Sequence, residues 1–528
     1  MHGDSILVES SALAAPIPDP SPGRQQPGDL NDELLNTPIW TDEMVQRAGI
    51  PIVDTQFVSV GGGMGSFCMV DHLRIAGVPT SSIKVLSNLD VPWQTYEYLT
   101  RVSQIPRMER LRSDSSGRPD NVWGFPSYAL HEAWHEKTLA PLWSVVTEPV
   151  FTDYWTPRAG TVFRSLEREA ARIRWQEVHV KGQVRLVRRR QNGGYFTINT
   201  PQEGTAPTKR VAYRSQYVHL AVGYPGLRFL PDLQEYRQQH NDFTRVVNAY
   251  EPHEFVYDTL KANGGTVLVR GSGIVASRVL QRLMEDRWDH GANTRILHLF
   301  RTYYSGRHGP TRFGKRRGSD GFAYQGFNWP KSAWGGQYQT EFERLEGDER
   351  KALYERIGGT HTPYRRLWQN QKSRARSEGW YDGIVGTVQA MRPADGSGVI
   401  STVKGPSGDL VDVRADFIID ATGLEGDLRD HRLPADLLDH SGAGRNVLGR
   451  LDVERSFEVR GVRSGEGRMY AVGAMTLGGY YAGVDTFLGL QFSSLRIVDD
   501  LAAQGFGHRI GVGRSISQWW KWFRHRSI

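Results

Sequence analysis

Along the chain, short apolar segments that end in glycine alternate with amphipathic segments. In the first of these, residues 56–67, a β-branched stretch breaks into glycines and continues as an apolar helix. Residues 264–276 repeat this order, and the apolar segments 217–223, 415–423 and 468–474 each end in small residues that include a glycine. Buried strands that alternate with helices predict an α/β fold built on parallel sheets.

The glycines at residues 61–66 have the spacing of a dinucleotide-binding turn. Gly61 suits the tight turn, Gly63 lets the backbone approach a pyrophosphate, and Ser66 is small enough for the helix to pack on the strand. The helix that follows points its free N–H groups at phosphates. Asn88 comes just after the next predicted strand, 83–86, where such a site binds ribose. A single turn of this kind also fits an ordinary strand–helix connection.

A second copy of the motif favours the nucleotide-binding interpretation. Gly271, Gly273 and Ala276 occupy its three positions, and an apolar helix follows to about Leu283. The two motifs are too far apart in the chain to serve one nucleotide. Together they predict two Rossmann-like dinucleotide-binding domains.

Length and charge narrow the class of protein further. The 528 residues suffice for two to three domains, and the 58 glycines fit several loops that approach phosphates. A net charge of +7 suits anionic ligands such as FAD and NADPH, and equally an acidic surface or nucleic acid. Because the sequence shows no recognition helix, zinc-finger spacing or RNP-type motif, we expect no nucleic-acid partner.

Cys68 is the only cysteine, and it falls inside the first apolar helix. A disulfide framework within the chain and a Cys-x-x-Cys redox pair are both excluded, and with them the dithiol mechanism of the disulfide-reductase flavoproteins. No apolar stretch reaches transmembrane length, and the N-terminus lacks a signal-peptide pattern. We therefore expect a cytoplasmic location.

Local patterns predict several further elements. Residues 14–29 contain five prolines and predict an extended arm, and the apolar clusters on either side of Pro38 predict two short helical pieces. An amphipathic helix is predicted over 157–173, and Asn-Gly-Gly at 192–194 predicts a hairpin turn. We expect the arginines at 188–190, beside this turn, on a solvated edge.

His131, Glu132 and His135 spell the zincin pattern on a predicted helix, with both imidazoles on one face. Catalytic zinc needs a third protein ligand, and only Glu148, Glu167 and Glu169 lie near in the sequence. A solvated helix face is the favoured interpretation, and a zinc hydrolase remains the alternative; we predict no metal site.

The order of the glycine motifs resembles that of a group of flavoproteins. A nucleotide turn, an Ala-Val-Gly strand, a second nucleotide turn, an Ala-Thr-Gly strand and a closing Ala-Val-Gly strand follow one another between residues 52 and 505. This order resembles the flavin-containing monooxygenases, Baeyer–Villiger monooxygenases and N-hydroxylases. The resemblance implies an FAD-binding domain and an inserted NADPH-binding domain.

The resemblance also assigns site residues. An irregular polar-aromatic stretch supplies Trp93 and Arg112 as a wall for the flavin ring, although an ordered loop with packed tryptophans fits this stretch equally. A closing helix supplies Asp485 and Gln491 near the flavin. Arg301 follows strand 296–300 and suits the 2′-phosphate of NADPH, with a plain surface arginine as the alternative. The residues assigned to the FAD site are Gly61, Gly63, Gly65, Ser66, Asn88, Trp93, Arg112, Asp485 and Gln491. Those assigned to the NADPH site are Gly271, Gly273, Ala276 and Arg301.

In this group NADPH reduces FAD, oxygen adds at flavin C4a, and the resulting (hydro)peroxide attacks the substrate. The resemblance therefore implies an FAD- and NADPH-dependent monooxygenase whose partners are molecular oxygen and a small molecule; it names no catalytic acid or base. Aromatic residues crowd 322–338 and 361–381, which indicates an apolar or aromatic substrate or, equally, core packing. A dehydrogenase, oxidase or quinone reductase is the main alternative function, and a nucleotide-binding protein without turnover is another.

The expected domains are an arm over 1–50, an FAD-binding domain over 51–240 and 401–510, and an NADPH-binding domain with the aromatic-rich substrate region over 241–400. The tail, 511–528, interleaves aromatic and basic residues. This composition is typical of a membrane interface or a partner-docking segment, and a tail packed on the body of the protein is the favoured alternative.

Overall fold

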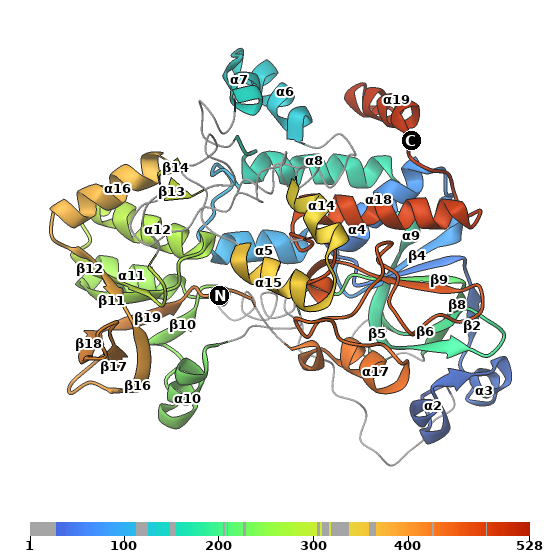
Figure 1. Cartoon of the computed structure of the whole chain (residues 1–528), viewed down its shortest axis with the longest axis horizontal. Helices are drawn as coiled ribbons and strands as arrows, with labels where there is room; N and C mark the ends of the chain where they lie inside the picture. The colour runs from blue at the N-terminus through green and yellow to red at the C-terminus, as the bar shows by residue number, and fades with distance from the viewer. Residues whose placement is uncertain are drawn as a thin grey trace.

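A computed structural model describes residues 28–111, 125–147, 155–203, 206–207, 210–224, 229–303, 307–308, 316–317, 337–357, 366–424, 427–481 and 483–528. Two large sheets lie toward opposite ends of the long axis, and helices connect and cover them (Figure 1). The predicted α/β class is confirmed. Arg112 and all of 318–336, including Phe322 and Trp334, lie outside the described residues.

The first sheet has ten strands, ordered β2-β8-β6-β5-β4-β3-β9-β20, with β1 beside β5 and β7 beside β6. From β5 to β20 neighbouring strands are parallel, whereas β5, β6 and β8 form an antiparallel extension. The strands are β1 (Ile39–Trp40), β2 (Ile52–Asp54), β3 (Phe57–Val60), β4 (Ile83–Ser87), β5 (His179–Arg190), β6 (Tyr195–Glu203), β7 (Ala206–Pro207), β8 (Val211–Ser215), β9 (Tyr217–Leu220) and β20 (Arg468–Ala471).

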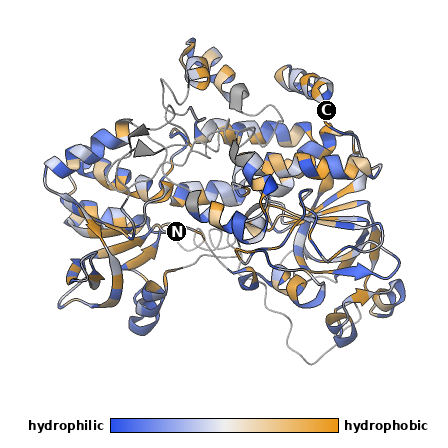
Figure 2. Cartoon of the chain, viewed as in Figure 1, coloured by the Kyte–Doolittle hydropathy of each residue, from blue (hydrophilic) through white to orange (hydrophobic). Residues whose placement is uncertain are grey.

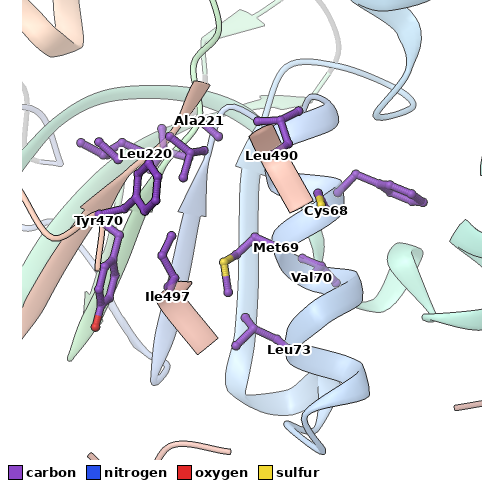
Figure 3. Close-up of a cluster of buried hydrophobic side chains, with 14 of the residues drawn as sticks. Cys68, Met69, Val70, Leu73, Leu220, Ala221, Tyr470, Leu490 and Ile497 are labelled. Atoms are coloured by element: carbon purple, nitrogen blue, oxygen red, sulfur yellow. The ribbon is translucent and has the colours of Figure 1, made fainter. Parts of the chain in front are cut away.

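Helices α4 (Met64–Ile75) and α18 (Phe487–Ala503) form the core against the parallel part of this sheet. Figure 3 shows Met69 and Leu73 of α4 in one cluster with Leu220 of β9, Tyr470 of β20 and Ile497 of α18. All four residues of β3 are buried, as expected for a central parallel strand covered on both faces. This packing fixes the end of β3, where the first glycine turn begins.

The second sheet has five parallel strands in the order β10-β19-β11-β12-β15. They are β10 (Val246–Asn248), β11 (Gly265–Arg270), β12 (Thr294–Phe300), β15 (Tyr381–Val385) and β19 (Phe417–Asp420). Helices α11 (Glu254–Asn263), α12 (Ile274–His290) and α16 (Arg366–Ser377) contribute to this unit, and Figure 2 shows its strands as hydrophobic. β11 and α12 carry the second glycine turn, as predicted.

An antiparallel three-stranded sheet joins the second unit. It consists of β16 (Thr387–Pro393), β17 (Val399–Lys404) and β18 (Leu410–Ala415), and α10 (Pro231–His240) packs against it. The two-residue strands β13 (Arg307–His308) and β14 (Arg316–Arg317) pair separately.

The expected domain boundaries need correction on both sides of the second unit. The boundary at 400/401 falls inside β17, and the chain returns to the first sheet only after β19, because Ile418 and Ile419 pair with β10 and β11. The boundary at 240/241 falls after α10, although Leu233 and Tyr236 of that helix pack in the second unit's core. The inserted unit therefore begins before α10 and ends after β19.

The two predicted helical pieces and the predicted hairpin are present, whereas residues 14–27 of the expected arm lie outside the described residues. The two helical pieces are α2 (Asp32–Asn36) and α3 (Asp42–Arg47), and β5 and β6 flank the turn at 192–194. The expected solvated edge at 188–190 is wrong for Arg188, whose side chain is 1% exposed and forms an ion pair with Asp436. Burial follows because α17 (Arg432–His440) and β1 cover this part of β5.

The remaining helices line the outside and the junction of the two units (Figure 1). They are η2 (Thr80–Ser82), α5 (Gln94–Val102), α6 (Phe125–Glu136), α7 (Ala140–Thr147), α8 (Ala159–Arg172), α9 (Trp175–Val178), α14 (Gln337–Arg344), α15 (Gly347–Ile357), η5 (Leu428–Asp430), η6 (Gly473–Thr476) and α19 (Val512–Phe523). α8 confirms the helix predicted over 157–173. Among the described residues, no helix has both the length and the apolar character to span a membrane.

Candidate functional site

The first glycine turn joins the carboxyl end of β3 to α4. Gly61 has φ +120°, and a Cβ there would lie 2.7 Å from the carbonyl carbon of Ala221, at the end of β9. Gly63 is the N-cap of α4, with φ −81° and ψ −162°. A side chain at Gly61 would therefore strain the backbone and collide with a neighbouring strand.

The second turn repeats this geometry between β11 and α12. Gly271 has φ +124°, and a Cβ there would also lie 2.7 Å from the carbonyl carbon of an alanine, Ala421 at the end of β19. Gly273 is the N-cap of α12, with φ −86° and ψ −173°. Both units therefore share a glycine with strongly positive φ, its close approach to a neighbouring strand, and a glycine N-cap on the helix that follows.

Both turns leave room where a nucleotide phosphate would lie. A Cβ on Gly63 would have only Leu89 Cδ1 nearby, at 3.9 Å, and a Cβ on Gly223 or Gly423, just after β9 and β19, would meet no described atom within 4 Å. Glycine cannot cap the first N–H groups of α4 and α12 with a side chain, so these donors face the open side of each turn. The residues present fit two dinucleotides.

Ser66 does more than provide a small side chain. Its buried hydroxyl accepts a hydrogen bond from Gly62 N at 3.0 Å and shares another with Ser59 Oγ at 2.8 Å. Ser59 Oγ in turn lies 2.9 Å from His219 Nδ1 on β9. Burial lowers the pKa of His219 to about 3, so this network is neutral. Sequence reasoning missed Ser59 and His219, which hold the first turn to β3 and β9.

A second buried histidine supports the other turn. His298 Nε2 lies 2.6 Å from Gly271 O, and its Nδ1 lies 2.9 Å from Tyr381 Oη. Because a carbonyl only accepts, Nε2 carries the proton, and Nδ1 accepts the hydrogen bond from the tyrosine hydroxyl. Burial lowers the pKa of His298 to about 3, which keeps this arrangement neutral. The only sequence signal is a histidine inside an otherwise apolar strand.

The end of β4 places Asn88 beside the first turn, as expected for a ribose-binding position. Ser87 Oγ donates to Gly61 O at 2.9 Å, so the strand end is tied directly to the turn. Asp90, in the same zone, is exposed and forms an ion pair with Lys181.

Trp93 is the N-cap of α5 and packs partly buried against the first core.

The first turn of α18 approaches the same locus. A Cβ on Gly65 would lie 2.9 Å from Ala221 Cβ and 3.6 Å from Leu490 Cδ2, so α4, β9 and α18 meet there (Figure 3). Asp485, just before α18, accepts a hydrogen bond from Tyr224 Oη at 2.5 Å. Gln491 is fully buried in α18. The structure thus brings both predicted residues to the end of α18 nearest the first glycine turn.

Ala276, the third residue of the second motif, lies in the first turn of α12 and is fully buried, as close packing of the helix on the sheet requires. Arg301 is exposed one residue after β12. β12 lies beside β11, with Leu299 opposite Arg270, so Arg301 is at the same sheet edge as Gly271. This is the edge at which a 2′-phosphate would lie.

The zincin pattern lies on α6, and one of its candidate third ligands, Glu148, lies outside the described residues. The imidazoles of His131 and His135 lie on α6 with ring centroids 4.9 Å apart. Glu132, the residue a zinc hydrolase would use as its base, is instead buried in an ion pair with Arg110. No group of three or more metal-ligating residues occurs among the described side chains.

Three aromatic residues of 361–381 belong to the described part of the chain and lie in a hydrophobic core. Trp368, Trp380 and Tyr381 are all less than 7% exposed and belong to the core of the second unit. Core packing, the alternative, accounts for these three. The aromatic residues at 322–336 lie outside the described residues.

Comparison with known proteins identifies the fold. The sequence matches no protein-family model and no curated protein. Solved structures do match: the ornithine hydroxylase PvdA of Pseudomonas aeruginosa has a TM-score of 0.60 at 16% identity, covering 85% of this chain and 99% of its own. The ornithine N-hydroxylase KtzI of Kutzneria sp. 744 has a TM-score of 0.60 at 14% identity, covering 86% and 100%.

The FAD-bound cadaverine monooxygenase DfoA of Erwinia amylovora has a TM-score of 0.59 at 13% identity, with coverage of 87% of this chain and 96% of its own. The fold is therefore that of the flavin monooxygenases with two dinucleotide-binding domains, as the resemblance in the sequence implied. The KtzI structure is described with reduced FAD, NADP+ and L-ornithine, and the DfoA structure with FAD; the two chains share only 14% and 13% sequence identity with this one.

Proposed function

We propose that this protein is an FAD- and NADPH-dependent monooxygenase that transfers one oxygen atom to a small molecule. The observation that carries the proposal is the repeated turn geometry: Gly61 and Gly271 have nearly the same φ and the same close approach to a neighbouring strand. Two such turns in one chain provide separate sites for a flavin dinucleotide and a nicotinamide dinucleotide.

The first turn is assigned to FAD and the second to NADPH. Gly61, Gly63, Gly65 and Ser66 support the FAD pyrophosphate, Asn88 faces its ribose, and Trp93, Asp485 and Gln491 border the flavin end. Gly271, Gly273 and Ala276 support the NADPH pyrophosphate, and Arg301 pairs with its 2′-phosphate. Arg112 remains a predicted FAD residue outside the described part of the chain.

Bound FAD supplies the redox and oxygen chemistry, and the chain's own residues bind and orient the two dinucleotides. The N-terminus of α18 directs the positive end of a 17-residue helix toward the flavin end of the first site. Asp485 is held there by Tyr224, which limits where its carboxylate can point. We assign no catalytic acid or base.

The substrate we favour is a small amine. The expectation of an apolar or aromatic substrate rested partly on Trp368, Trp380 and Tyr381, which are core residues. The structural neighbours are named for ornithine and cadaverine, both of which carry primary amines. A nitrogen atom is accordingly the proposed site of oxidation, and aromatic small molecules form the comparison panel.

The visible spectrum of the purified protein tests the cofactors. We expect a yellow protein whose flavin absorbance bleaches under anaerobic conditions when NADPH is added. Colourless protein that cannot be reconstituted with FAD would overturn the proposal.

Oxygen consumption then separates a monooxygenase from the alternative, a non-oxygenating flavin oxidoreductase. We expect a primary amine from a panel to stimulate oxygen uptake and to gain one oxygen atom by mass spectrometry. Flavin that NADPH reduces, but that transfers electrons to quinones or dyes without oxygenating any panel member, would favour the alternative.

A further inference from the structure

Helix α19 is fixed to the body of the protein through one face. Arg172 of α8 donates to Gln518 Oε1 at 3.3 Å, and the Arg168 guanidinium lies 4.9 Å from the centre of the Trp522 ring. Gln518 and Trp522 are buried. The tail is therefore packed on the body, and its orientation is defined.

The opposite face of α19 is apolar and exposed. Val512, Ile516, Trp520 and Phe523 are 46–74% exposed and lie three or four positions apart, so they share one side of the helix. The rings of Trp519, Trp520 and Phe523 stack on one another, with centroids 5.5–6.1 Å apart. Packing on α8 does not require this aromatic stripe.

A second apolar group lies on the same side of the protein. Trp134, Leu139, Trp143 and Val146 of the α6–α7 pair are 61–86% exposed. Glu136 of α6 forms an ion pair with Arg158 at the start of α8, whereas α19 packs near the end of α8. α8 has 14 residues, which corresponds to about 21 Å, and Figure 1 shows the helices that carry the two groups, α6, α7 and α19, beyond α8 along one edge. We call these eight exposed residues the apolar edge.

The charge around the apolar edge is positive. After Asp500 the sequence contains no acidic residue, but it contains five arginine and lysine residues: Arg509, Arg514, Lys521, Arg524 and Arg526. The two acidic side chains of α6, Glu132 and Glu136, are both in ion pairs with arginine. The edge therefore combines exposed tryptophans with a C-terminal segment rich in arginine and lysine.

We infer that the apolar edge binds the surface of a membrane containing anionic lipids. Tryptophan prefers the headgroup region, and a helix with an apolar face and a cationic flank lies in the plane of the interface. A second copy of this chain is a poorer occupant, because it would bring another cationic face against the first. The inference does not depend on the proposed reaction.

Vesicle flotation of the full-length flavin-loaded protein tests the inference. We would compare phosphatidylcholine vesicles with vesicles of equal parts phosphatidylcholine and phosphatidylglycerol. The test variants are the double substitution W520E/F523E and the single substitution W143E. The matched control is Leu410→Glu, because Leu410 is 62% exposed on β18 in the other unit. Flavin content and Tm verify that each variant is folded.

We expect the parent and the L410E control to float with anionic vesicles at least about tenfold better than with neutral ones, and salt at about 0.5 M to weaken binding. W520E/F523E and W143E should each bind at least about tenfold more weakly. Failure of the parent to float with anionic vesicles, or parental binding by the folded double variant, would overturn the inference. Concentration-dependent self-association that W520E/F523E abolishes would instead assign the edge to a second copy.

Discussion

Replacing Gly61 or Gly271 by alanine should separate the two nucleotide sites. At each position φ is strongly positive, and the new Cβ would lie 2.7 Å from a backbone carbonyl carbon. Because the colliding atoms are backbone atoms, no side-chain rotation relieves the contact. The turn must move away from β9 in one variant and from β19 in the other.

The size of the effect follows from two contributions. An unfavourable backbone conformation costs about 1–3 kcal/mol, and overpacking against a neighbouring strand costs about 1–3 kcal/mol more. If the turn moves to relieve both, nucleotide affinity falls by a comparable free energy. Since 1.4 kcal/mol corresponds to a factor of ten, even the lower sum of about 2 kcal/mol weakens binding roughly thirtyfold.

Flavin content and anaerobic reduction measure the two effects independently. We expect Gly61→Ala to purify with little FAD and to require at least about thirtyfold more FAD for reconstitution. Gly271→Ala should retain FAD but need at least about thirtyfold more NADPH to bleach it at half the maximal rate. Gly396→Ala is the control: its φ is +84°, but no described atom lies within 4 Å of the new Cβ, so only Tm should fall.

Two results would refute this reasoning. Loss of FAD from Gly271→Ala, with the NADPH response of Gly61→Ala retained, would reverse the assignment of the sites. Parental affinity for both dinucleotides in both folded variants would show that the turns do not contact phosphates.

Three further changes test other residues of the site. Arg301→Ala should lower the preference for NADPH over NADH about tenfold in kcat/KM, because only NADPH has a 2′-phosphate; an equal loss for both cofactors would contradict the assignment. Ser66→Ala leaves buried partners unsatisfied and should lower the free energy of unfolding in urea by about 1–3 kcal/mol, whereas unchanged stability would show that the network is dispensable. Burial lowers the pKa of His219 and of His298 to about 3, whereas both histidines bind protons below about pH 6.5 in the unfolded chain. The free energy of unfolding should therefore fall on acidification from about pH 6.5 toward pH 4. The expected slope is up to roughly 1.4 kcal/mol per pH unit for each histidine. His298→Gln should remove one histidine's share of that slope in urea titrations at several pH values, and an unaltered slope would contradict the buried neutral state.

The sequence predicted the parts of the fold that depend on local patterns. Glycine spacing located both glycine turns, amphipathic periodicity located α8, and Asn-Gly-Gly located the hairpin between β5 and β6. In each case the signal lies within about 20 residues of chain, where backbone conformation and amphipathic periodicity determine the element.

Features that depend on distant partners were not predictable in this way. Arg188 is buried under α17, whose Asp436, 248 positions later, is its ion-pair partner. Ser59 and Ser66 become a network only when β9 brings His219 beside them, 160 positions after Ser59. Sheet order likewise assigns β19 to the second unit, although its sequence resembles strands of the first.

The connection of the second unit to the first has a consequence for engineering. The unit's first strand, β10, and its last strand, β19, are neighbours in one sheet, and they have three and four residues. At about 3.3 Å per residue, the points of entry and exit on this sheet are roughly 10 Å apart. Because α10 precedes β10 and packs in the core of the same unit, a replacement unit would have to include α10. Under the proposed assignment, the second unit is a cassette whose exchange would change the preference for the nicotinamide cofactor while leaving the strands of the first sheet in place.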